Sequence, residues 1–168
     1  MRKLVVALTI VALALVCMAQ APPSGNASDE FTFVAGGDMI GPYKTLKGIA
    51  DPAFRQVASL FQRADVGFAN QEGAIFDLAT FPGYPSAETG GGYPLSSAVV
   101  AHDLRAVGID LVSKANNHAI DWGAEGLLAT LRSLADAGIV QAGSGRSDDE
   151  ARAAAYLQTS KGKVALVS

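Results

Sequence analysis

The sequence predicts an α/β fold in which short apolar strands alternate with amphipathic helices. Three observations support this prediction. The strand–helix order repeats along the chain, which is typical of layered α/β domains. Several predicted strands end in polar residues, and sites in open α/β sheets form at such strand ends. The 168 residues contain no internal repeat or low-complexity tract and are enough for one domain with a real core.

Residues 1–21 have the features of a secretory signal peptide. Arg2-Lys3 is followed by an apolar run from Leu4 to Met18 and by the small-x-small sequence Ala19-Gln20-Ala21. We therefore predict cleavage after Ala21 and export to the periplasm or cell surface, with a membrane anchor if the segment stays uncleaved. The chain has one cysteine, Cys17, which lies in this segment. Any metal in the mature chain must therefore be held by oxygen and imidazole ligands.

A linker is predicted at residues 22–30, which are rich in Pro, Ser, Gly, Asn and Asp, and the domain is expected over 31–168. The first strand is predicted from Phe31 to Gly36. Gly36-Gly37 lets the backbone turn and leaves Asp38 at the end of the strand. Asp38 could ligate a metal there, or it could accept hydrogen bonds from neighbouring turn amides.

Asp51-Pro52 predicts the capped start of a helix. A second strand is expected at Asp65 to Asn70, followed by Gln71 and Glu72, so that a second acid follows a second strand. Glu72 could instead be a solvated loop residue.

Residues 76–95 show no periodicity and carry Gly, Pro and Tyr, which predicts a long surface loop. Tyr84 and Tyr93 could line a substrate groove or simply anchor this loop. Ser96 or Ser97 is expected to cap the next helix and Gly108 to end it. His102 lies within this helix and is expected to be a surface residue.

The stretch Lys114 to Gly123 lies between a strand at Ile109 to Ser113 and a helix at Ala124 to Ala137. Its imidazole and oxygen ligands suit metal or proton-transfer chemistry. The alternative is a polar loop in which the asparagines satisfy turn amides and Asp121 caps the helix. After it we expect a strand at Ile139 to Ala142, a helix that begins at Asp148-Asp149-Glu150, and a β-hairpin at 155–168.

Three motifs together resemble the CapA family of capsule and poly-γ-glutamate synthesis proteins. They are Gly37-Asp38, Asn70-Gln71-Glu72 and Ala115-Asn116-Asn117-His118-Ala119-Ile120-Asp121-Trp122-Gly123. The CapA domain is similar to the calcineurin-like metallophosphatases, and the resemblance covers Phe31 to Ser168. It implies a layered α-β-β-α sandwich. Because the sequence stops within a predicted strand, we expect the chain to cover roughly the first half of that sandwich.

The resemblance also implies two divalent metal ions at the strand ends, without distinguishing Mn, Mg, Fe or Zn. Asp38 would ligate the first ion, Glu72 would bridge both, and Asn117 would ligate the second. His118 would orient substrate or protonate a leaving oxygen, and Asp121 would hold His118 or shape the loop.

Asn116 and Tyr93 are the predicted substrate-binding residues. Ile40 stands where many metallophosphatases have a histidine, and His102 and His118 are the two histidines of the whole chain. We therefore expect about half of the full site here.

These implications predict an exported, metal-dependent hydrolase of the phosphoesterase type. Its substrate would be a phosphoester or an anionic polymer such as poly-γ-glutamate, and it could associate with membrane-bound polymer synthesis machinery. The alternative is a non-catalytic envelope protein that binds or helps export an anionic polymer. The formal net charge of −3 indicates no nucleic-acid partner.

Overall fold

The fold is seen in a computed structural model, which describes residues 30–41, 50–83, 85 and 93–168. The chain divides into two units, Met1–Phe31 and Thr32–Ser168, and the account below concerns the second. The predicted signal peptide and most of the predicted linker lie outside the described residues, as does Tyr84. None of the helices in the described ranges is long and apolar enough to cross a membrane.

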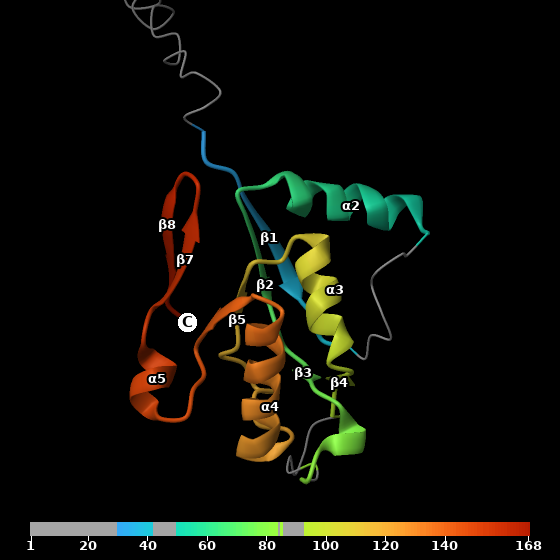
Figure 1. Cartoon of the computed structure of the whole chain (residues 1–168), viewed down its shortest axis with the longest axis vertical. Helices are drawn as coiled ribbons and strands as arrows, with labels where there is room; N and C mark the ends of the chain where they lie inside the picture. Colours follow the sequence, from blue (N-terminus) through green and yellow to red (C-terminus); the bar gives the residue numbers. More distant parts are fainter. Residues whose placement is uncertain (1–29, 42–49, 84, 86–92) are drawn as a thin grey trace, which may run out of the picture. The chain divides into compact units, whose positions relative to one another are not determined.

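Strands and helices alternate along the second unit, as predicted (Figure 1). The strands are β1 (Phe33–Asp38), β2 (Val66–Asn70), β3 (Ala74–Ile75), β4 (Leu95–Ser96), β5 (Leu111–Ser113), β6 (Val140–Ala142), β7 (Ala155–Thr159) and β8 (Gly162–Leu166). The helices are α2 (Pro52–Arg63), the short 3-10 helix η1 (Leu78–Thr80), α3 (Val99–Val107), α4 (Gly123–Asp136) and α5 (Asp148–Arg152).

The main sheet has the strand order β1-β2-β5-β6, and every neighbouring pair is parallel. The strands therefore follow each other in space as they do along the chain, with α2, α3 and α4 as the crossovers. Crossovers between parallel strands are right-handed, and here each one leads to the next strand on the same side of the previous strand. The three helices therefore lie on the same face of the sheet. The α/β prediction is confirmed, whereas the finer α-β-β-α sandwich remains a prediction.

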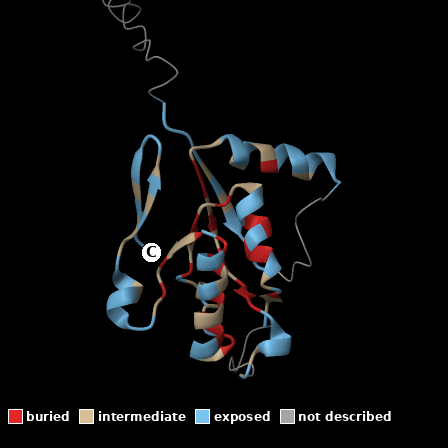
Figure 2. Cartoon of the chain, in the orientation of Figure 1, coloured by how far each residue is buried: buried red, intermediate tan, exposed pale blue. Residues whose placement is uncertain are grey.

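The hydrophobic core fills the space between these helices and the sheet. Figure 2 shows that buried residues concentrate on β2, β5 and the inner sides of α3 and α4. The core cluster consists of Ala69, Ile75, Val100, Ala101, Leu104, Ile109, Val112, Leu134, Ala137 and Ile139. The buried centre of the sheet thus fixes the strand ends that carry the polar motifs.

The other face of the sheet carries an exposed aromatic ring, that of Phe33. A Cβ atom added at Gly36 or Gly67 would point at Phe61 of α2, so these positions face the helices. Phe33 and Phe68 lie at alternating positions and face the opposite way. Their rings stack 6.1 Å apart, and Phe33 remains 49% exposed. We call this surface the open face.

Local predictions had mixed outcomes. The Asp51 cap is confirmed, because its side chain accepts a hydrogen bond from Ala53 N. The end of α3 at Gly108 (φ 105°) and the terminal hairpin are confirmed as well. The cap at Ser96 or Ser97 is wrong. Ser96 pairs with Ile75 in the small β3–β4 sheet, and α3 begins after Ala98 without a side-chain cap.

Candidate functional site

The ends of three parallel strands bring the polar motifs together. Asp38 at the end of β1 is in register with Asn70 of β2, and Asn70 is in register with Ser113 of β5. The segments that follow β2 and β5 carry Glu72 and His118, so all three predicted groups lie at the carboxyl edge of the sheet. Because the strands lie side by side in chain order, Asp38, Glu72 and His118 become neighbours in space although they are far apart in the sequence.

The carboxyl groups of Asp38 and Glu72 are close enough to share a hydrogen bond. Asp38 Oδ1 also accepts a hydrogen bond from Asn70 Nδ2 at 2.9 Å. Burial raises the pKa of Glu72, and the hydrogen bond and negative charge of Asp38 raise it further. Two acids held against each other disfavour the state in which both are ionised, and a bound cation would relieve that repulsion.

His118 stands beside this pair with its ring orientation fixed. Its Nδ1 lies 2.7 Å from Asp121 Oδ2, and its Nε2 lies 3.7 Å from Glu72 Oε1. With Nδ1–H donated to Asp121, the Nε2 atom is directed toward the carboxyl pair. Asp121 is therefore in place to hold His118. The alternative that Asp121 caps α4 is wrong, because the cap residue is Trp122 and no side chain makes a capping bond.

The two asparagines of the motif differ in their surroundings. Asn116 Nδ2 donates to Asn70 Oδ1 and to Gln71 O, both at 3.0 Å, while its Oδ1 accepts from His118 N at 3.1 Å. Asn116 thus bonds to the backbone and side chains of the surrounding turns, in agreement with the alternative that the stretch is a polar loop whose asparagines satisfy turn amides. Asn117 is exposed. The metal role of Asn117 and the substrate role of Asn116 stay predictions.

Tyr93 lies beside the same loop. Its ring meets Trp122 edge-on at 6.0 Å, and it is 45% exposed. Trp122 in turn packs against Phe76 and Phe81. This aromatic cluster anchors the loop after Asp121 and leaves part of Tyr93 accessible, so its predicted contact with substrate stays a prediction.

Two buried polar residues, Lys114 and Gln71, lie in the predicted motifs but had no predicted role. Lys114 is 1% exposed, and its Nζ donates to Glu72 O at 2.8 Å and to Gly73 O at 3.3 Å. Burial lowers the pKa of Lys114 to about 8, against the opposing effect of Asp121 and Glu72. Gln71 is 2% exposed, and its Nε2 also donates to Gly73 O.

The donor atoms fit one hard divalent cation better than a complete two-metal centre. Carboxylate oxygens are the ligands that Mg²⁺ and Mn²⁺ prefer, and the adjacent carboxyl groups of Asp38 and Glu72 supply them. Within the described ranges, no group of three or more His, Cys, Asp or Glu side chains could hold a metal ion. A second ion would need amide oxygens such as that of Asn117, or further ligands.

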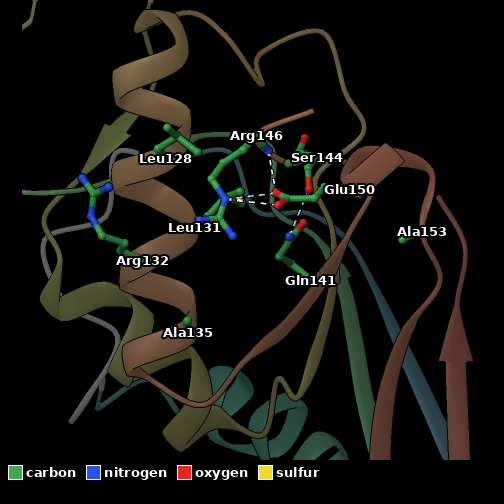
Figure 3. Close-up of a pocket in the computed structure, with 10 residues that line it drawn as sticks. Leu128, Leu131, Arg132, Ala135, Gln141, Ser144, Arg146, Glu150 and Ala153 are labelled. Atoms are coloured by element: carbon green, nitrogen blue, oxygen red, sulfur yellow. Dashed lines mark hydrogen bonds and ion pairs between the residues drawn. The ribbon is translucent and has the colours of Figure 1, made fainter. Parts of the chain in front are cut away.

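A separate pocket in the described part of the chain lies away from these residues. It has a volume of about 500 Å³ and is formed by α4, β6, α5 and the loop between β6 and α5 (Figure 3). Arg146 and Glu150, which both line it, form an ion pair. None of the predicted site residues lines this pocket. We therefore define the candidate site by its chemical groups and not by this pocket.

Comparisons with known proteins agree with the motifs. Two curated relatives, the uncharacterized proteins y4sH and y4uA of Sinorhizobium fredii (strain NBRC 101917 / NGR234), are 45% and 44% identical over 143 residues. These matches cover 85% of this chain but 31% of each relative, so the chain spans about a third of their length. The family described as "Bacterial capsule synthesis protein PGA_cap" matches residues 32–168, and this chain therefore belongs to that family.

Proposed function

We propose that this chain carries part of an exported, metal-dependent hydrolase of capsule or poly-γ-glutamate synthesis. Asp38 and Glu72 would hold the first divalent ion, and His118 would act as the proton donor. The substrate would be a phosphoester or an anionic polymer. Membership of the capsule synthesis family supports the biological setting.

One observation carries the chemical part of this proposal. The paired carboxyl groups of Asp38 and Glu72 stand next to His118, whose Nε2 is 3.7 Å from Glu72 Oε1. Two carboxyl groups in contact, with Glu72 half-buried, are unfavourable when both are ionised, so such a pair is more often a functional arrangement than a structural one.

The side chains have complementary roles in this reaction. Asp121 would keep His118 in one orientation, with Nε2 available to give a proton to a leaving oxygen. A bound divalent ion would supply Lewis-acid stabilisation of the negative charge that develops on the reacting group. Asn117 would add an amide oxygen from the exposed side of the loop.

We also propose the layered α-β-β-α sandwich for the whole domain. The open face, with the exposed Phe33 ring stacked on Phe68, is suited to packing against a second sheet. Helices on one side and a second sheet on the other would then bury both faces of the β1-β2-β5-β6 sheet.

The direct test is the metal content of the purified chain, measured by mass spectrometry beside Asp38→Ala and Asn117→Ala. We expect at least one Mn or Fe ion per chain in the unmodified protein and its loss in Asp38→Ala. A smaller loss in Asn117→Ala would identify a second, weaker ion. An unmodified chain that binds no added Mn²⁺ would contradict the proposal.

The polymer-binding alternative has less support. Such a protein needs a basic groove, but four of the described basic side chains are already paired with carboxylates: Arg105 with Asp110, Arg146 with Glu150, Arg152 with Asp148, and Lys161 with Asp65. Polymer binding that survives chelation, with no turnover, would favour this alternative over the hydrolase.

A further inference from the structure

Lys114 extends from a firmly bonded backbone to the turn that carries Glu72. It directly follows β5, and its backbone is bonded on both sides: its N–H donates to Ala142 O, and its carbonyl accepts from Ser144 Oγ, each at 2.8 Å. From there, the buried side chain crosses to the turn between β2 and β3. Its ammonium group donates to the carbonyls of Glu72 and Gly73.

Gln71 holds the same turn from the other direction. Its Nε2 donates to Met39 O at 3.2 Å and to Gly73 O at 2.9 Å. Met39 follows Asp38 directly, and its carbonyl also accepts from the N–H groups of Glu72 and Gly73. Gln71 therefore joins the end of the strand that carries Asp38 to the turn that carries Glu72.

We propose that Lys114 and Gln71 are positioning residues, a buried clamp that sets the spacing of the Asp38 and Glu72 carboxyl groups and hence the affinity for a divalent cation. This inference rests on the proposed metal site and extends it to residues that touch no ion. Both side chains are almost completely buried and bond to backbone carbonyls at the turn. When the backbone of the turn that carries Glu72 is fixed, the Glu72 carboxylate can take fewer positions.

Because Lys114 is positively charged, the direction in which metal affinity changes when it is replaced tests the inference. An ammonium group near the site repels a divalent cation, so a residue that acted through charge alone would weaken binding, and its removal would tighten it. A residue that acts by positioning does the opposite. Loss of a partner that supports metal ligands from outside typically weakens metal affinity about 10–100-fold.

The experiment measures Mn²⁺ affinity of the full, metal-stripped chain by calorimetry at 20 °C for three variants. Lys114→Met keeps an unbranched side chain of similar length and removes the ammonium donor to the carbonyls of Glu72 and Gly73. Gln71→Met removes the second donor without changing charge. Lys163→Met is the matched control, because Lys163 is exposed on β8 and packs over Tyr156.

We expect the dissociation constant to rise about 10–100-fold in Lys114→Met and in Gln71→Met, and to stay within twofold in Lys163→Met. Melting temperatures in EDTA show whether each variant is folded at 20 °C. A lower melting temperature with unchanged affinity would mean a purely structural role and would overturn the inference, as would tighter binding in Lys114→Met.

The possible failures are distinguishable. An unmodified chain that does not bind Mn²⁺ at millimolar concentration would overturn both the proposed function and this inference. Normal binding by the unmodified chain together with normal binding by both clamp variants would overturn the inference alone. If Lys114→Met shows no cooperative melting transition, the charge-neutral Gln71→Met decides.

Discussion

Replacing Glu72 by Gln should stabilise the metal-free protein and abolish its stabilisation by metal. The substitution keeps the shape of the side chain and removes its charge. In the folded protein, burial and the neighbouring Asp38 raise the pKa of Glu72, while His118 and Lys114 act in the opposite direction. The ionised side chain therefore costs free energy at neutral pH, and Gln removes that cost.

The pH dependence has a definite sign. Because the pKa of Glu72 is raised above its ordinary value of 4.5, the folded chain holds this proton more tightly than the unfolded chain does. The contribution of Glu72 to the free energy of unfolding is thus fully present below about pH 4.5 and is lost as pH rises through the folded pKa. In EDTA, the gain in Tm from Glu72→Gln should therefore be larger at neutral pH than at acidic pH.

The metal response can be estimated by linkage. With Mn²⁺ at 100 times its dissociation constant, the unmodified chain should gain about 2.7 kcal/mol of stability. For a domain of this size, that corresponds to a rise in Tm of roughly 5–10 °C. Glu72→Gln should show no such rise, because the variant lacks a carboxylate that is proposed to hold the first ion together with Asp38.

Differential scanning fluorimetry with EDTA or Mn²⁺ measures both effects. Glu150→Gln is the control, because hydrogen bonds from the backbone and side chain of Arg146 lower the pKa of Glu150. That variant should lose stability at neutral pH relative to acidic pH, and it should keep the full Mn²⁺ response. The reasoning about Glu72 is refuted if Glu72→Gln melts at a lower temperature in EDTA at neutral pH, or still gains stability from Mn²⁺.

Two further predictions concern packing and proton transfer. A Cβ at Gly67 would lie 1.9 Å from the carbonyl oxygen of Gly108, so Gly67→Ala should lower the free energy of unfolding by about 1–3 kcal/mol in urea titrations. Gly37→Ala, where nothing lies within 4 Å, should change it by less than about 0.5 kcal/mol. At a saturating Mn²⁺ concentration, Asp121→Asn should reduce turnover of a phosphoester about 100-fold or more, because His118 loses the carboxylate that holds it. Equal turnover in Asp121→Asn and the unmodified chain would remove His118 from the proposed proton transfer.

The sequence was sufficient to predict that the residues of the candidate site follow the ends of neighbouring strands. Asp38, Glu72 and His118 each follow an apolar run, and parallel strands in consecutive order bring their carboxyl ends to one edge. The α/β class follows from the same alternation of strands and helices. These features depend on local patterns that repeat along the chain, and such patterns can be read without knowing the packing.

The supporting residues could not be predicted in this way. Lys114 looks like an ordinary polar residue after a strand, and its partners are backbone carbonyls 41 and 42 positions away, at Gly73 and Glu72. Similarly, the sequence does not say which of two adjacent asparagines turns inward. Asn116 bonds to Asn70, whereas Asn117 is exposed, and the conformation of the loop decides this.

The charges of the described site suggest why a second ion would bind more weakly than the first. Asp38, Glu72 and Asp121 contribute three negative charges when ionised and Lys114 contributes one positive charge, which leaves −2 if His118 is set aside. One divalent ion neutralises this charge. A second ion would leave an excess of +2, so it needs additional acidic ligands or an anionic substrate to share the site. A phosphoester or a polycarboxylate supplies that charge, and so the second ion and such a substrate should each strengthen the binding of the other.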